Sequence, residues 1–357
     1  MSEIDELREQ IDALDRKLVK LLNDRARTAL EIGKFKNASG LSIYAPDREA
    51  SILRRVTQES EGPLSPSAIT SIYREIISST RRMERLLVVT YLGPPGTFTH
   101  QAARDQFGTG VEYTPAENIE SVFHAVSKEL ADVGVVPVEN STGGVVNETL
   151  DMFMSYDLKI CDEIILAIHH NLLGRCPIEQ VTKVCSKPEA LAQCRMWVSE
   201  HLPHVDLVAV ASTTAAARMA LEEEHTAAIA SREAAELYEL NILAANVEDH
   251  HENVTRFVVL AGQCGSRTGR DRTSVMFAVK NQVGALYEML VPFKKHSINL
   301  TKIESRPSRT RAWDYCFFVD LEGHMDDAEV SAALYEVEQG CRYFQVLGSY
   351  PRASVQE

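Results

Sequence analysis

Two cations near the start of the chain, Arg25 and Lys36, have the residue type and spacing to bind an anion. At 100° per residue both fall within the apolar stripe of a long amphipathic segment, and Arg8 lies at its edge. A buried cation without a partner is costly, so cations on a buried face indicate anions beside them, from side chains or from a bound ligand. The alternative is that Arg25 extends to solvent and Lys36 complements a helix C-terminus, but several such cations together favour a charged guest. The apolar stripe consists of Ile4, Leu7, Ile11, Leu14, Leu18, Leu21, Leu22, Ala29 and Ile32.

Two glycine-containing loops are a second candidate for anion binding. GPPGTFT at 93–99 and NSTGG at 140–144 each follow a predicted strand and precede a predicted helix. Free backbone N–H groups and hydroxyls in such loops bind anions, and two loops facing one cleft favour this over simple tight turns at their glycines. By contrast, His250 and His251 lie in the polar stretch EDHHEN and are expected to be solvated rather than catalytic.

Composition and charge exclude several classes of protein. The 357 residues predict two or three domains. The net charge of −14 argues against nucleic acid as a partner, although residues 1–87 are nearly neutral, with 15 basic and 14 acidic side chains. No run approaches the roughly 20 apolar residues of a membrane span, and no apolar signal precedes the first helix, so we expect a cytoplasmic protein. Seven cysteines without CxxC or zinc spacing fit a reducing compartment and predict no metal site: Cys161, Cys176, Cys185, Cys194, Cys264, Cys316 and Cys341.

The first 87 residues predict three helices of unequal length. The first runs from residue 1 to about Ala38, before Gly40, and the second opens at Pro46 and ends near Glu59. The third is announced by Ser65 as N-cap and Pro66 at the first helical position, and it ends at about residue 85. Three such helices cannot cover one another, so we expect a dimer that shares them.

Beyond residue 87, short β-branched runs alternate with helical patterns, which predicts an α/β architecture with largely parallel strands. Two consecutive stretches, 88–165 and 166–245, repeat this alternation and predict two lobes with a cleft between them. RFVVLAG at 256–262 returns the chain to a sheet. The predicted strands are VVTYL, GVVPVE, IILAIHH, KVCS, VDLVAVAS and TAAIAS.

After the polar linker CGSRTGRDR, the pattern is strand, helix, strand, strand, helix, strand, which predicts a ferredoxin-like α+β module. A small module of this kind after an enzyme body indicates a sensor, although a fold alone implies no function. The chain is therefore expected to be multidomain, with an all-α domain at 1–87, a two-lobed α/β domain at 88–265 and an α+β domain at 271–357.

The helical segment resembles the all-helical chorismate mutases in LREQIDALD, LLNDRARTALEIGKFK and DRE. The resemblance implies that Arg8, supplied by a partner subunit, and Arg25 hold the two carboxylates of chorismate, with Arg48 adding positive charge nearby. It also implies that Glu49 binds the ring hydroxyl and that Lys36 donates to the ether oxygen, where negative charge develops as the C–O bond breaks.

Two positions depart from the chorismate mutase pattern. Ala45 stands where many members carry an acidic residue, so a contact there must come from the backbone. Glu84 stands where some members have a glutamine that donates to the ether oxygen, with Thr80 one turn earlier. Because a carboxyl group donates only when protonated, we hypothesise that burial raises the pKa of Glu84 and that mutase activity falls as pH rises through it. The alternative is a solvated Glu84 in a decayed mutase.

The middle region resembles prephenate dehydratases in YLGPPGTFTHQAA, PVENSTGGVVNETLD and NVTRFVVLA. The resemblance implies that Thr255 is essential for dehydration by donating to the leaving hydroxyl, that Arg256 binds a carboxylate and that Phe257 shapes the pocket. It implies neither a metal nor a cofactor. Secondary substrate contacts are expected from Thr97, Asn140, Ser141, Thr142, Ser212 and Thr213.

The last segment resembles phenylalanine-sensing ACT domains in GALYEML and ESRP. The resemblance implies that a helix start receives the amino-acid carboxylate on free N–H groups, and that sites form between paired modules of a homodimer or homotetramer. A purely structural dimerisation module is the alternative. The implied effector-binding residues are Gly284, Ala285, Leu286, Glu304, Ser305 and Arg306.

Together the three resemblances follow the order of the bifunctional chorismate mutase/prephenate dehydratase family. They imply conversion of chorismate to prephenate and then to phenylpyruvate, with phenylalanine as inhibitor and with no nucleic acid or membrane as partner. One rival is an enzyme that prefers arogenate to prephenate. Another is a binding protein whose cleft senses a small acid and whose helices only dimerise.

Overall fold

The computed structural model describes residues 3–38, 44–250, 252–263, 265–279, 282–307, 315–353 and 355–356. Gly40, His251, Cys264 and the start of the strand expected at 312–323 therefore lie outside the described residues. The chain forms two compact units, Met1–Leu87 with Phe107–Glu112, and Val88–Gln106 with Tyr113–Glu357. Within the described ranges, no helix combines the length and apolar character needed to cross a membrane.

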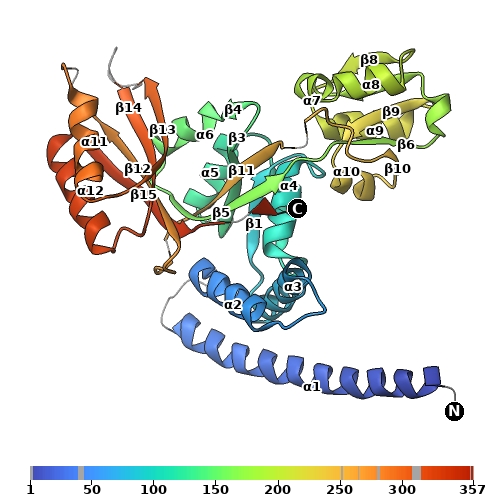
Figure 1. The fold of residues 1–357 in the computed structure, drawn as a ribbon, viewed down its shortest axis with the longest axis horizontal. Helices are drawn as coiled ribbons and strands as arrows, with labels where there is room; N and C mark the ends of the chain where they lie inside the picture. Colours follow the sequence, from blue (N-terminus) through green and yellow to red (C-terminus); the bar gives the residue numbers. More distant parts are fainter. Residues whose placement is uncertain are drawn as a thin grey trace. The chain divides into compact units, whose positions relative to one another are not determined.

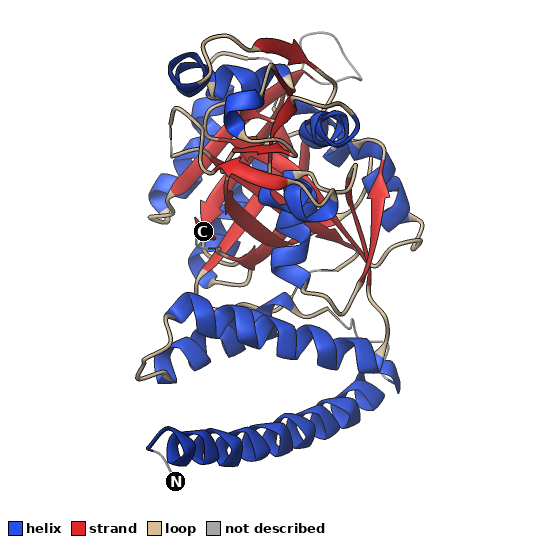
Figure 2. Ribbon diagram, turned by 90° about the vertical axis from the view of Figure 1, so that its right-hand side faces the viewer, coloured by secondary structure: helices blue, strands red, loops and turns tan. Residues whose placement is uncertain are grey.

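The first unit contains the three predicted helices, drawn in blue in Figure 2. They are α1 (Glu3–Ala38), α2 (Pro46–Glu59) and α3 (Pro66–Glu84). Ser65 caps α3 by accepting a hydrogen bond from the Ala68 amide at 3.2 Å, as the sequence predicts. The apolar stripe of α1 is largely uncovered, because seven of its side chains are between 52% and 64% exposed: Ile4, Leu7, Ile11, Leu14, Leu18, Leu21 and Ile32.

The second unit begins with a sheet in the strand order β16-β5-β11-β3-β1-β2, with β4 beside β3 (Figure 1). β11 lies in its centre and pairs antiparallel with both β3 and β5. The helices of this part are α4 (Phe98–Phe107), α5 (Ile119–Ser127) and α6 (Asn147–Phe153). The strands are β1 (Val88–Leu92), β2 (Glu112–Ala116), β3 (Val133–Asn140), β4 (Gly144–Val145), β5 (Lys159–Ala167), β11 (Val254–Ala261) and β16 (Val355–Gln356).

A second sheet, in the order β10-β6-β9-β7-β8, forms the other lobe. Its strands are β6 (Asn171–Gly174), β7 (Lys183–Ser186), β8 (Asp206–Ala209), β9 (Thr226–Ala230) and β10 (Asn241–Ala244). Its helices are η1 (Ile178–Gln180), α7 (Pro188–Gln193), α8 (Arg195–His201), α9 (Thr213–Glu222) and α10 (Arg232–Leu237).

The prediction of largely parallel strands was wrong. β1 pairs parallel with β3, and β7 with β8 and β9, but β6 runs antiparallel to β9 and β10, and β11 runs antiparallel to both of its neighbours. The physical reason is that the chain passes from β5 of one sheet to β6 of the other and returns from β10 to β11, so no strand–helix–strand crossover within one sheet leads into β6 or β11. Only a longer crossover, usually a helix, brings the next strand back in parallel.

The final six elements follow the predicted ferredoxin-like order. They are β12 (Asp271–Ala278), α11 (Ala285–Lys295), β13 (Leu300–Pro307), β14 (Tyr315–Glu322), α12 (Ala328–Gly340) and β15 (Tyr343–Pro351). Their antiparallel sheet, in the order β13-β14-β12-β15, carries α11 and α12 on one face (Figure 1). Val275 and Phe277 pack toward these helices, whereas Met276 and Phe318 join the core of the first sheet. The module therefore packs on the dehydratase-like region through the other face of its sheet.

We expect Gly348→Ala to destabilise this unit. A Cβ at Gly348 would lie 2.0 Å from the carbonyl oxygen of Ile160 on β5, a contact that only a shift of two packed backbones can relieve. Overpacking of this kind costs about 1–3 kcal/mol or more. Thermal unfolding of the full chain should show a lower midpoint for this variant than for Gly262→Ala, whose Cβ would meet no atom within 4 Å. Equal midpoints would contradict the expectation.

Candidate active sites

The helical unit brings the predicted cations next to carboxyl groups. Arg25 on α1 donates from Nη1 to the hydroxyl of Thr80 on α3 at 3.3 Å. The Thr80 hydroxyl donates in turn to the carbonyl of Ile76 at 2.6 Å. Lys36, near the end of α1, acts electrostatically on both Glu49 and Glu84. Residues from all three helices therefore meet around the cations that the sequence singled out.

Glu84 lies close to α1 because Gly33 has no side chain. A Cβ at Gly33 would lie between 2.7 and 2.9 Å from the Cγ, Cδ and Oε2 atoms of Glu84. Burial raises the pKa of Glu84, while the charges of Lys36 and Arg81 act in the opposite direction. The direction agrees with the hypothesis of a carboxyl group that stays protonated at higher pH than usual.

Arg81 is a site residue that the sequence reasoning missed. It is 5% exposed, and its Nη2 donates to Glu49 Oε1 at 2.5 Å. Its guanidinium carbon lies 5.4 Å from the ring centroid of Tyr44 and 5.9 Å from that of Phe107. Burial raises the pKa of Glu49, and Arg81 opposes this rise. Arg81 lies four residues after Ile77 on the apolar side of α3, so the periodicity that identified Arg25 would have identified it too.

One atom of Arg81 is not satisfied by the protein. Its Nη1 is buried and makes no hydrogen bond within the described residues. Burying a guanidinium nitrogen without an acceptor costs free energy, which indicates that the site binds an anionic ligand.

Three other predicted residues of this unit lie apart from that cluster. Arg8 is exposed and pairs weakly with Asp5 at 3.8 Å. It precedes Arg25 by 17 positions, or about 25 Å along one helix, so the two cannot hold the same small molecule within one chain. Arg48 is exposed on α2, and the Ala45 carbonyl accepts the first hydrogen bond of that helix, from the Glu49 amide at 3.0 Å.

In the second unit, Thr255 on β11 lies directly opposite Asn140 on β3. The Asn140 amide nitrogen donates to Thr255 Oγ1 and to Asn253 Oδ1, both at 2.8 Å. Asn140 Oδ1 accepts from the backbone N–H of Thr142 at 3.0 Å and of Gly143 at 2.7 Å. Asn140 thus ties the loop to the threonine hydroxyl.

These contacts correct the expectation of free N–H groups at residues 141–143 of NSTGG, and at two residues of GPPGTFT. In NSTGG, the N–H groups of residues 141–143 are all used, by the Val254 carbonyl or by Asn140 Oδ1. In GPPGTFT, the Gly93 N–H donates to the Ala116 carbonyl and the Gly96 N–H to His100 Nδ1. The amides of Gly93, Gly96 and residues 141–143 are therefore engaged within the protein rather than offered to an anion.

A chain of polar side chains extends from Thr142 into the second lobe. Gln193, at the end of α7, donates from Nε2 to Thr142 Oγ1 at 2.9 Å. Its Oε1 accepts from Asn253 at 3.3 Å and lies 2.8 Å from His170 Nε2. Burial lowers the pKa of His170, which is 1% exposed and hence neutral near pH 7. Neither Gln193 nor His170 was predicted, because no local pattern marks residues that meet only when two lobes fold together.

The remaining predicted contacts of this region serve local structure. The Ser212 hydroxyl caps α9 by accepting from an amide of that helix at 2.9 Å, and the Thr97 hydroxyl donates to a backbone carbonyl at 3.2 Å. The Ser141 hydroxyl accepts from the Val254 amide at 3.0 Å. Thr213 and Phe257 are 4% and 1% exposed. No hydrogen bond in the described part of the chain joins these residues to the Thr255 hydroxyl.

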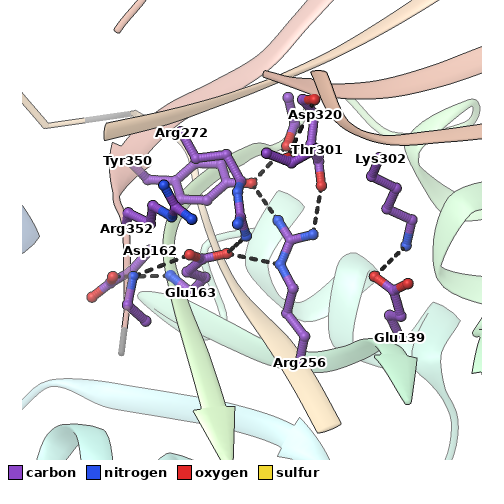
Figure 3. A network of polar contacts seen from close by, with 12 residues as sticks. Glu139, Asp162, Glu163, Arg256, Arg272, Thr301, Lys302, Asp320, Tyr350 and Arg352 are labelled. Atoms are coloured by element: carbon purple, nitrogen blue, oxygen red, sulfur yellow. Dashed lines mark hydrogen bonds and ion pairs between the residues drawn. The ribbon is translucent and has the colours of Figure 1, made fainter. Parts of the chain in front are cut away.

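Arg256 does not occupy the position expected of a carboxylate-binding residue. As the neighbour of Thr255 on a strand, it points to the opposite face of the sheet. Its three nitrogens already donate to Glu163 at 2.7 Å, Asp320 at 2.5 Å and the Tyr350 hydroxyl at 2.8 Å (Figure 3). The guanidinium therefore belongs to a buried network between the two domains, and its predicted role at the substrate is corrected.

The predicted effector residues are only partly available. Gly284 caps α11 in the left-handed conformation, and the Ala285 N–H, expected to be free, donates to the Gln282 carbonyl at 3.2 Å. Arg306 donates through Nε and Nη2 to both oxygens of Asp151 on α6, each at 2.9 Å. Arg306 is thus an interdomain residue in this structure. A pocket of about 640 Å³ on the module is lined by other residues, around the start of α12.

Three families match the chain in order. Residues 7–85 match "Chorismate mutase type II", residues 89–264 match "Prephenate dehydratase" and residues 273–339 match "ACT domain". The bifunctional chorismate mutase/prephenate dehydratase of Aquifex aeolicus is 49% identical over 362 residues and covers 100% of both chains. Its counterpart in Pseudomonas aeruginosa is 43% identical and covers 97% of each chain.

Among solved structures, the prephenate dehydratase of Arthrobacter aurescens in complex with L-Phe aligns with a TM-score of 0.70 and 35% identity. That alignment covers 75% of this chain and 90% of the other. The prephenate dehydratase of Staphylococcus aureus aligns with a TM-score of 0.66 and 29% identity, over 74% and 100% of the two chains.

The two catalytic domains make this chain an enzyme with two activities, an isomerase that acts as a chorismate mutase and a lyase that acts as a prephenate dehydratase. The matches extend over nearly the full length of the chain, in the order mutase, dehydratase, ACT domain. On these grounds, the chain belongs to the family of bifunctional chorismate mutase/prephenate dehydratases.

Proposed function

We propose that the cluster around Arg25, Lys36 and Glu84 is the chorismate mutase site, and that Thr255 with Asn140 is the dehydratase site. The observation that carries the first assignment is the orphan Nη1 of Arg81, which calls for an anion among residues of α1, α2 and α3. The second rests on the 2.8 Å hydrogen bond that fixes the Thr255 hydroxyl. The corresponding domains are 1–87 and 88–265, followed by the ACT domain at 271–357.

At the mutase site, Arg25 and Arg81, together with Arg8 of the partner subunit, bind the carboxylates of chorismate. Lys36 and protonated Glu84 donate to the ether oxygen. The reaction is a unimolecular rearrangement, so the protein forms no covalent intermediate. It holds the flexible substrate in a compact conformation and stabilises the negative charge that develops on the ether oxygen. Glu49, held by Arg81, faces the ring hydroxyl.

At the dehydratase site, the direction of one hydrogen bond defines the role of Thr255. Asn140 donates to Oγ1, so the hydroxyl hydrogen of Thr255 is directed to a different acceptor. We assign that acceptor to the leaving hydroxyl group of prephenate. Loss of CO2 and water then aromatises the ring and gives phenylpyruvate. Gln193 and Thr142 keep Asn140 in the orientation that this step requires.

Phenylalanine is the proposed effector, because the similar Arthrobacter aurescens protein was solved with L-Phe. Gly284, Leu286, Glu304 and Ser305 are the proposed contacts, in a site completed by a second ACT domain. The exposed stripe of α1 supports a homodimer or homotetramer in which helices are shared. In that assembly, Arg8 of one subunit completes the mutase site of another.

We expect Thr255→Ala to lower the dehydratase rate by about 10²–10⁴-fold and to leave the mutase rate unchanged. Incubated with chorismate, the variant should accumulate prephenate, whereas the unmodified chain forms phenylpyruvate that phenylalanine suppresses. Thr255→Ser, which keeps the hydroxyl, is the matched control, and arogenate offered in parallel tests substrate preference. Undiminished phenylpyruvate formation by Thr255→Ala would refute the assignment.

Mutase activity should fall as pH rises through the pKa of Glu84. Burial raises that pKa, and only the protonated carboxyl group donates to the ether oxygen, so activity is present below the pKa and lost above it. Glu84→Gln carries a permanent donor and should flatten the profile between pH 5 and 8, while Glu31→Gln, an exposed position on α1, should not. A pH-independent rate in the unmodified chain would count against the idea.

Complementation tests the sharing of Arg8. Arg8→Gln and Arg25→Gln should each abolish mutase activity alone, because each removes a carboxylate-binding cation from every site. When the two variants are co-expressed, half of the dimers are mixed, and each mixed dimer has one intact site, which restores about a quarter of the activity. No restoration despite recovery of mixed dimers would show that both arginines act within one subunit.

A further inference from the structure

The catalytic strands present two different pairs of residues on their two faces. Thr255 of β11 is in register with Asn140 of β3, and the next residue pair along is Arg256 with Glu139. Successive side chains of a strand point to opposite faces. Arg256 and Glu139 therefore lie behind the pair that we assign to dehydration.

The ACT domain binds both residues of this rear pair (Figure 3). Lys302 of β13 donates from Nζ to Glu139 Oε2 at 2.9 Å, and its side chain is 11% exposed. Asp320 of β14 accepts from Arg256 at 2.5 Å. Each residue next to the catalytic pair is thus held by one charged side chain of the regulatory domain.

The contact at Arg256 is part of a neutralised buried network. Glu163 accepts from both Arg256 and Arg272, so two cations are balanced by two carboxylates, Glu163 and Asp320. Burial acts to raise the pKa of Asp320, but Arg256 and Ser274 hold it below its ordinary value. Asp320 therefore favours its charged form within this network.

The two interdomain ion pairs border one small cavity. This cavity, of about 20 Å³, is lined by Arg256, Lys302, Asp320 and Ser274 together with apolar side chains of both domains. Lys302 also lies two positions before Glu304, one of the proposed effector contacts, on the same strand. A displacement of β13 on effector binding would therefore move Lys302 relative to Glu139.

We propose that Lys302 is a positioning residue of the dehydratase: through Glu139 it fixes Asn140, and with the Asp320–Arg256 pair it couples the effector site to Thr255. The inference rests on the proposed function of Thr255 and extends it to the regulatory domain. Under this proposal the ACT domain contributes to dehydratase catalysis, because its Lys302 side chain holds β3, the strand that carries Asn140.

The test is Lys302→Met in the full chain, with Lys302→Arg as the conservative variant. We expect kcat for prephenate to fall roughly tenfold with little change in KM, phenylalanine inhibition to weaken, and mutase activity to stay unchanged. Lys302→Arg keeps the charge and should retain most of the rate. Lys295→Met is the matched control, because Lys295 pairs with Glu336 at 2.7 Å entirely within the ACT domain.

A second variant distinguishes a positioning role of Lys302 from a role in only holding the ACT domain against the dehydratase domain. Glu139→Gln should reproduce the loss in kcat, and the exchanged pair Glu139→Lys with Lys302→Glu should recover part of it and part of the phenylalanine response. If Lys302→Met behaves like Lys295→Met while Thr255→Ala is inactive, the inference is overturned and the proposed function stands. If Thr255→Ala remains active, the proposed function falls, and the inference falls with it.

Discussion

The hydrogen bond from Asn140 to Thr255 joins residues 115 positions apart and depends on a single strand pairing. It exists because β11 returns from the second lobe and lies antiparallel between β3 and β5. The pairing of β11 with β3 determines which residues of β11 lie on the face that carries Thr255 and which lie on the face toward the ACT domain. A slip of one residue would exchange Thr255 with Arg256 and bring a saturated ion network to the substrate side.

Two buried arginines in this chain show how a cation that is paired within the protein differs from one that has the capacity to bind a ligand. Arg256 donates to two carboxylates and a phenol, so each of its three guanidinium nitrogens already has an acceptor in the protein. Arg81 binds Glu49 but keeps a buried nitrogen that has no acceptor in the described part of the chain. Motif resemblance selected Arg256 as a binding residue and did not select Arg81. The count of partners reverses that choice, because leaving a buried donor unsatisfied is costly unless a ligand compensates.

The sequence predicted those features that depend on local patterns. Caps and periodicity placed α2 and α3, and alternation placed the ferredoxin-like order, since each signal lies within a few residues of the element it defines. The direction of β11, the bond from Asn140 to Thr255 and the bond from Gln193 to Thr142 depend on contacts between segments more than 50 residues apart. No periodicity encodes such contacts, so they could be found only in the folded chain.

The two carboxyl groups of the mutase cluster differ in how substrate will act on them. Burial raises the pKa of both groups. For Glu49 this rise is opposed mainly by the charge and hydrogen bond of Arg81, whereas for Glu84 it is opposed mainly by the charge of Lys36. A bound dianion places negative charge beside these cations and weakens their effect on Glu84. By the same electrostatics, a like charge nearby favours the neutral carboxyl form. If Glu84 donates to the ether oxygen as proposed, the substrate promotes the protonation that this step requires. We therefore expect the alkaline limb of kcat to lie at higher pH than that of kcat/KM.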